Sequence, residues 1–130
     1  MKVLALVFLC LISQAFAGEV IELQRGVQVK NQDIIASVNE VMRESIYWED
    51  EGYEFNMLST TNTVFIMKIF KNDTGETEKL ELEAMVRAGG FGWHEGYQEG
   101  YSDCRVTLYK NNGSWKDAEG DADCEMIWDF

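Results

Sequence analysis

Few side chains in this sequence have the type and spacing that catalysis requires. His94 is the only histidine, and Glu95 and Asp103 lie near it in sequence. A histidine beside a carboxylate can serve as a general base, but no nucleophilic serine or cysteine motif accompanies this one. The chain holds 23 acidic residues, so a pair of carboxylates is no sign of glycoside hydrolysis. We therefore predict no catalytic residue and no enzymatic activity, and interpret His94 as a solvated loop residue.

The acidic run 117–123 is the segment that comes nearest to a metal site. It places carboxylates at the first, third and fifth positions of a loop, which suits a hard cation such as calcium. The EF-hand pattern is not met, because the sixth position is Ala122 instead of glycine and the twelfth is Trp128 instead of glutamate. We interpret the run as a solvated acidic loop, with a weak calcium contact as the alternative. We expect no metal site and no cofactor.

The first 17 residues have the pattern of a secretory signal peptide. Lys2 precedes the apolar run 3–12, and the small-residue triplet Ala15-Phe16-Ala17 ends the segment. The apolar run is too short to span a bilayer. We expect cleavage after Ala17 and secretion of residues 18–130 as one extracellular domain. Loss of Lys2 changes the net charge from −12 to −13.

The cysteines and two glycosylation motifs fit the same compartment. Cys10 leaves with the signal segment, so Cys104 and Cys124 remain. Two cysteines in a secreted chain most simply form one disulfide, and an intermolecular bridge or free thiols are the alternatives. Sequons at Asn72 and Asn112 each lie in a polar stretch between apolar runs, as exposed glycosylation acceptors must.

The strongly acidic composition limits the partners that we expect. A net charge of −12 offers no basic surface for nucleic acid or for an anionic membrane. Such a charge favours a basic protein or a metal ion, or it serves solubility alone. We expect an extracellular protein as partner, with no binding of nucleic acid or membrane.

Hydrophobic periodicity predicts a strand, one helix and then further strands. The first strand covers 20–30 and is interrupted at Gly26, where a bulge or bend is natural. Apolar residues then recur at helical spacing over 31–46, with Asn31 as the N-cap. Five later strands are expected at 53–57, 64–70, 78–87, 104–110 and 124–130.

The segments between these elements are interpreted as turns and loops. The polar segments 48–52, 59–63, 71–76 and 111–123 carry the turn-forming residues. The stretch 89–100 holds glycines at 89, 90, 92, 96 and 100, interleaved with aromatic residues. We expect a loop or a wide turn there, because no helix or long strand tolerates that composition. Its aromatic side chains either line a pocket or interface or fold back into the core.

The order of these elements resembles the cystatin superfamily. Its secreted members wrap a sheet around a single helix, close the last hairpin with a disulfide and carry a tryptophan at the tip of that hairpin. Cys104, Trp115 and Cys124 hold the corresponding places here, and 53–70 takes the place of the family's first inhibitory hairpin. The resemblance implies an α+β fold in which one amphipathic helix packs on an antiparallel sheet.

Cystatins inhibit papain-like cysteine proteases by inserting a wedge of three segments into the active-site cleft. By position, the resemblance implies contacts from Gly26 (or Gly18), from the loop 59–63 and from Trp115. The loop consists of Ser59, Thr60, Thr61, Asn62 and Thr63, so the family's Gln-x-Val-x-Gly pattern is absent. The family's Pro-Trp is replaced by Ser114-Trp115, and its upstream disulfide is missing.

Two hypotheses of function follow. The first is a secreted protein-binding module that acts as a divergent inhibitor of papain-like cysteine proteases by loop insertion. The alternative is an extracellular carrier that holds a small apolar ligand between the helix and the sheet. Met42, Phe65, Met67 and the aromatic residues of 91–101 would line such a cavity, and they would otherwise form a plain hydrophobic core.

Overall fold

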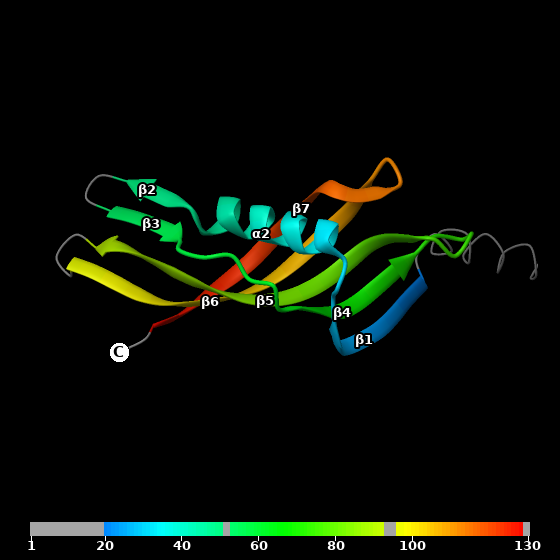
Figure 1. Cartoon of the computed structure of the whole chain (residues 1–130), viewed down its shortest axis with the longest axis horizontal. Helices are drawn as coiled ribbons and strands as arrows, with labels where there is room; N and C mark the ends of the chain where they lie inside the picture. The colour runs from blue at the N-terminus through cyan, green and yellow to red at the C-terminus, as the bar shows by residue number, and fades with distance from the viewer. Residues whose placement is uncertain (1–19, 51–52, 93–95, 129–130) are drawn as a thin grey trace, which may run out of the picture.

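The described part of the chain is one α-helix and an antiparallel β-sheet, as the computed structural model shows for residues 20–50, 53–92 and 96–128 (Figure 1). The elements in chain order are β1 (Val20–Gln28), α2 (Gln32–Ile46), β2 (Trp48–Asp50), β3 (Tyr53–Met57), β4 (Val64–Lys71), β5 (Thr77–Gly92), β6 (Gly96–Asn111) and β7 (Ser114–Trp128). The predicted α+β class, with its single helix, is confirmed for these residues. The expected leader, Gly18 and His94 lie outside them.

The helix begins and ends where the sequence signals predict. The Asn31 side chain accepts hydrogen bonds from the backbone N–H groups of Asp33 and Ile34, which satisfies two donors that the first turn would leave unpaired. Its buried face packs on one face of the sheet, where Val38 and Met42 are fully buried. The sheet contributes Leu80, Leu82, Ala84, Val86, Cys104, Val106 and Leu108 to this core.

The sheet has the strand order β1-β4-β5-β6-β7, and each neighbouring pair is antiparallel. β3 pairs with the end of β5 near Gly90, and β2 pairs with β3. β3 and β4 therefore pair with successive parts of β5, and in this strand order they do not pair with each other. The expectation that 53–70 forms a hairpin is wrong, since the loop 59–63 is a connection between two strands that each pair with β5.

The glycine-rich stretch 89–100 is a second point where the sequence prediction is wrong. Its described residues extend β5 to Gly92 and begin β6 at Gly96, in register as Phe91 opposite Tyr97. Gly90 is required because β3 approaches closely: a Cβ added there would lie 1.7 Å from the backbone oxygen of Glu54. The glycines thus permit strand packing instead of breaking the strand.

The last two strands are also longer than predicted. The acidic run 117–123, expected as a loop, lies inside β7, and the connection shrinks to a turn at Asn112 and Gly113. Both turn residues have positive φ angles, of 48° and 75°, which is the backbone that tight hairpins favour. Ala118, Gly120 and Ala122 are small residues at alternate positions of β7, the strand on which α2 packs.

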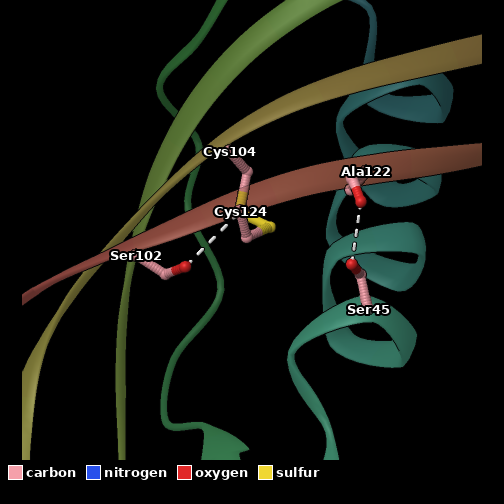
Figure 2. The surroundings of a disulfide bond; sticks show 5 residues. All are labelled: Ser45, Ser102, Cys104, Ala122 and Cys124. Atoms are coloured by element: carbon pink, nitrogen blue, oxygen red, sulfur yellow. Dashed lines mark hydrogen bonds between the residues drawn. A yellow bond between two sulfur atoms is a disulfide. The ribbon is translucent and has the colours of Figure 1, made fainter.

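The predicted disulfide joins Cys104 and Cys124, which are directly opposite each other on β6 and β7 (Figure 2). Cys104 is fully buried in the core. The bridge is therefore intramolecular, and it fixes the register of the final hairpin between the middle of β6 and the C-terminal half of β7.

Helix α2 also contacts the outer edge of β7 through serine hydroxyls. Ser45 Oγ donates to the carbonyl oxygen of Ala122 at 2.9 Å, as Figure 2 shows. Ser37 Oγ donates to the carbonyl oxygen of Trp115 at 2.8 Å and accepts from the N–H of Ala118 at 3.2 Å. Backbone groups that face away from β6 are thus satisfied by the helix.

Candidate binding surfaces

The three segments expected to form one wedge lie apart in the structure. Gly26 has a φ angle of +88° and lies at the bulge of β1, which is one edge of the sheet. Trp115 lies in β7, the strand at the other end of the order, and is partly buried against the core. The structure thus places the glycine and the tryptophan that were expected to meet in one wedge on strands that three others separate.

The loop 59–63 is held against the helix instead of projecting from the sheet. Asn39, a buried residue of α2, donates from Nδ2 to the carbonyl oxygen of Thr61 and accepts from its N–H through Oδ1, both at 2.8 Å. Ser59, Thr60, Asn62 and Thr63 are exposed. The structure therefore does not bring the loop together with Gly26 or Trp115 as a common tip.

Another set of segments does converge at one end of the sheet. Val20, at the start of β1, is opposite Lys71 at the end of β4, and Lys79 of β5 is opposite Tyr109 of β6. The turn 72–76 and the turn 112–113 therefore emerge at the same end, as Figure 1 shows. We call this surface, made of the two turns and the start of β1, the turn end.

Side chains at the turn end form a shallow hollow with both polar and apolar lining, made of Phe70, Glu76, Glu78, Lys79, Tyr109, Lys110 and Gly113. The ammonium group of Lys79 lies 4.1 Å from the ring centre of Phe70, a cation–π contact. Lys110 lies 5.7 Å from the ring centre of Trp115. These contacts link β4, β5, β6 and β7 next to the two turns.

Both sequons lie at this same end. The Asn72 carboxamide oxygen accepts hydrogen bonds from the Thr74 N–H, the Thr74 hydroxyl and the Glu76 N–H, so that it organises its turn. Asn112 is exposed at the tip of the β6–β7 turn. The sequence separates these two asparagines by 40 positions, and only the strand pairing places them on one surface.

The residues expected to line a cavity between helix and sheet are not gathered around one space. Met42 is fully buried in a packed cluster. Phe65 lines a separate hollow with Glu83 and Asp103, and it is directly opposite Glu83 in the sheet. Phe91, from the glycine-rich stretch, is 56% exposed. The structure thus distributes these side chains among different surroundings.

An aromatic hollow of about 310 Å³ lies at the end of the sheet opposite the turn end. Its lining is mainly apolar and comprises Trp48, Tyr53, Glu54, Phe55, Gly90, Phe91, Gly92, Gln98 and Met126. Trp48 and Tyr53 are in contact, with ring centres 5.2 Å apart. The sequence prediction assigned Trp48 to a turn and missed this site. The recurrence of aromatic residues at 48, 53, 55 and 91 is the only signal that could have indicated it.

Two tyrosines near the aromatic hollow have perturbed acidity. Tyr97 donates a hydrogen bond of 2.8 Å to Glu99, and this bond, together with partial desolvation and the negative charge, raises the pKa of the Tyr97 hydroxyl. A hydrogen bond from Tyr47 to Glu49 likewise raises the pKa of the Tyr47 hydroxyl. Both phenols therefore stay protonated, and able to donate a hydrogen bond, to a higher pH than an ordinary tyrosine.

Comparisons with known proteins give no match: no family model, no curated protein and no solved structure is similar to this chain. Across the described ranges, no three or more histidine, cysteine, aspartate or glutamate side chains are grouped so that they could hold a metal ion. Nor does α2, the helix of those ranges, have the length and apolar character needed to cross a membrane.

Proposed function

We propose that this protein is a secreted protein-binding module, a divergent relative of the cystatins, that uses its turn end to block the cleft of papain-like cysteine proteases. The observation that carries the proposal is the strand pairing. The start of β1 and two hairpin turns lie together at one end of an antiparallel sheet that packs on a single helix. A wedge inhibitor needs three adjacent projecting segments of this kind.

The residues of the two turns support the same assignment in a revised alignment. The first hairpin turn is that of β4 and β5, and Gly75 is the fifth residue of 71–75, the place of the glycine in the family's Gln-x-Val-x-Gly. Trp115 follows the second turn by two residues, as in a displaced version of the family's second loop. The loop 59–63 has no part in this revised wedge.

The local geometry suits inhibition without chemistry. The hydrogen bonds that Asn72 accepts hold the first turn in shape before a partner arrives, so little conformational entropy is lost on binding. Gly113 and Gly75 each supply a positive φ angle that keeps the turns narrow. Narrow, preorganised turns can enter a cleft that a broad loop cannot.

The signal peptide, the disulfide and the sequons support an extracellular place of action. The bridge between Cys104 and Cys124 is the kind that persists in an oxidising compartment. Glycans on Asn72 and Asn112 would stand on the proposed wedge itself. Occupancy of the sequons would therefore regulate access of the turn end to a protease.

The test is a titration of papain and of a cathepsin with the purified mature protein, in which residual activity is followed with a peptide substrate. Two forms of the unchanged sequence are compared, the protein from a glycosylating host and the disulfide-bonded protein from a host that does not glycosylate, because substitution of Asn72 would remove the acceptor that organises the first turn. We expect stoichiometric inhibition by the unglycosylated form, at least about tenfold weaker inhibition by Trp115→Ala, and none of this loss in Thr60→Ala. Absence of inhibition by the unglycosylated protein at micromolar concentration would refute the protease assignment.

A further inference from the structure

The last part of β7 has an edge that no other strand pairs with. Among the described residues, β6 is the one strand that pairs with β7. α2 covers the first part of the other edge through Ser37 and Ser45, and the last of these hydrogen bonds reaches the carbonyl oxygen of Ala122 (Figure 2). β7 continues past this point to Trp128, as Figure 1 shows. The edge after Ala122 therefore receives no hydrogen bond from the helix.

The backbone groups of Cys124 and Met126 point away from β6. The Cα atoms of Cys104 and Cys124 are 4.1 Å apart, which is the spacing of an antiparallel pair that exchanges no backbone hydrogen bonds. The N–H and carbonyl groups of Cys124 therefore face the outer edge, and by alternation those of Met126 do as well. The described residues form no hydrogen bond with these groups from outside the sheet. We call the outer edge at Cys124 and Met126 the open edge.

A row of carboxylates borders the open edge. Asp121, Asp123 and Glu125 are exposed and occupy alternate positions of β7, so their side chains lie on one face of the sheet. The alternating residues Cys124 and Met126 are packed against the core on the other face. A strand beside β7 would thus meet backbone groups at the open edge, an acidic face on one side and an apolar face on the other.

The charge next to the open edge remains negative. On β6, Asp103 is directly opposite Glu125 and Arg105 is directly opposite Asp123. These four residues and Cys124 line a hollow of about 450 Å³, which thus holds three carboxylates and one guanidinium group. The ion pairs found among the described residues use the carboxylates of Glu40, Glu81 and Glu99. A partner that brings positive charge is therefore favoured here.

We propose that the open edge binds an extended, basic segment of a partner protein, which adds to the sheet as an antiparallel strand beside β7. The added strand exchanges backbone hydrogen bonds with Cys124 and Met126. Lysine or arginine side chains at its alternate positions lie opposite Asp123 and Glu125, because directly opposed residues share a face of the sheet. The residues between them lie on the face of Cys124 and Met126, which suits apolar side chains. This interaction is independent of the turn end.

The charge decides between this partner and a second copy of the chain. Two β7 strands paired in antiparallel orientation through their open edges would bring the two acidic rows side by side, and like charges in such positions are destabilising. Each chain also carries a net charge of −12. The acidic row therefore hinders self-pairing at the open edge, as charged residues do on other edge strands, and attracts a basic strand.

The test measures binding of labelled peptides to the mature, disulfide-bonded protein by fluorescence anisotropy. The probe is the peptide Lys-Val-Lys-Val-Lys-Val-Lys, and a first control has glutamate in place of every lysine. In a second control each valine is N-methylated, which preserves the charge but removes the N–H groups that would face β7. In a third control the lysines between the valines are N-methylated, where the N–H groups would point away from β7.

We expect the basic probe to bind, the glutamate peptide to show no detectable binding, and added salt to weaken the probe. The N-methylvaline peptide should bind at least about tenfold more weakly than the probe, whereas the N-methyllysine peptide should stay close to it. Equal affinities of the two N-methylated peptides would indicate attraction by charge without strand pairing, and would overturn the proposal. Absence of binding of the probe at millimolar concentration would overturn it too.

Variants locate the interaction on β7. Asp123→Asn with Glu125→Gln should weaken binding of the probe about fivefold. Asp33→Asn with Glu40→Gln removes two exposed carboxylates from α2 and is the matched control, which should change affinity by less than about twofold. Circular dichroism verifies that both variants are folded. Equal weakening in both variants, or a dimer in sedimentation of the protein alone that the probe disperses, rejects a basic strand as the specific occupant.

Discussion

Asn39 and Thr61 bind each other through two hydrogen bonds of 2.8 Å, one in each direction between the Asn39 carboxamide and the backbone of Thr61. Asn39 Nδ2 also donates to the carbonyl oxygen of Ile35 within the helix. One buried side chain thus fixes the connection between β3 and β4 against α2. Because β3 and β4 both pair with β5, this connection fixes where β3 and β4 lie relative to each other along β5.

Substitution of Asn39 tests this relationship. Asn39→Ala leaves the N–H and the carbonyl group of Thr61 without their partner, and we expect it to lower the free energy of unfolding by about 2–4 kcal/mol. Asn39→Asp retains an acceptor but loses both donated bonds, so it should also destabilise. Thr60→Ala, at an exposed neighbour, is the control and should change stability by less than about 0.5 kcal/mol. Urea unfolding followed by tryptophan fluorescence measures all three.

The disulfide gives a second prediction about stability. Replacing Cys104 and Cys124 together by alanine removes a closed loop with a sequence separation of 20 and should cost about 3 kcal/mol in the chain-entropy model. Intact mass measured after alkylation, with and without reduction, reports the bridge in the parent protein. A parent that takes up two alkyl groups without reduction would contradict the intramolecular bridge.

Gly90 and Gly75 form a matched pair of glycine tests. Gly90→Ala places a methyl group against the backbone of Glu54, which cannot move without parting β3 from β5, so we expect a loss of about 3 kcal/mol or more. Gly75→Ala meets no neighbouring atom and suffers only from its φ angle of +86°, a cost of about 1–2 kcal/mol. Amide hydrogen exchange should show that protection is lost in β3 for Gly90→Ala alone. Equal effects in the two variants would argue against the close approach of β3.

The acidity of Tyr97 predicts the behaviour of the protein at alkaline pH. Its hydrogen bond to Glu99 raises the pKa above the ordinary value of 10.0, so the stabilising contribution is complete below pH 10 and is lost as the pH rises through the folded-state pKa. Because the pKa of Tyr47 is raised as well, the titration is carried out in a Tyr47→Phe background, where ultraviolet titration of tyrosinate should show one phenol that ionises late. In Glu99→Gln, the same phenol should ionise at lower pH, because the negative charge of its acceptor is gone and the charge of Arg87 now favours the tyrosinate. A late titration that survives in both Glu99→Gln and Tyr97→Phe would assign it elsewhere.

Local sequence signals correctly predicted the elements whose structure depends on residues close together in the chain. The helix was predicted over 31–46 and begins at Gln32 after its Asn31 cap, because capping and 3.6-residue periodicity act over a few residues. The strand predicted at 64–70 and the bulge at Gly26 are confirmed for the same reason. The pairing of β3 with β5 was missed, because a loop signal marks a change of direction but does not specify the partner strand.

The glycine-rich and acidic segments show why composition misled the prediction. Gly90 is compatible with β5 because the neighbouring backbone occupies the space of a side chain, and no single-strand pattern contains that information. In β7, the positions beside α2 are Ala118, Gly120 and Ala122, so the apolar half of the alternation is made of small residues and the acids dominate the composition. Both errors arise because tertiary contacts place small residues at positions where a strand pattern leads us to expect large apolar side chains.

The candidate surfaces were predictable only in part. The two sequons and Trp115 were found from the sequence, but their gathering at one end depends on the pairing of β4 with β5 and of β6 with β7. The aromatic hollow depends on where α2 stops relative to β2 and β3. Such relationships join residues that are distant in the chain, and local periodicity does not record them.

The contact between α2 and the edge of β7 has a consequence for the fate of the protein when it opens. The backbone groups bonded to Ser37 and Ser45 are covered by a helix, not by another strand. If the helix detaches while the sheet persists, this edge becomes a template on which the same strand of a second molecule can pair. Competition between re-docking of the helix and recruitment of a neighbour would then set the half-life of the soluble form. Two hydroxyl groups on one helix thus keep this strand edge from being a template for a second molecule as long as the helix stays docked.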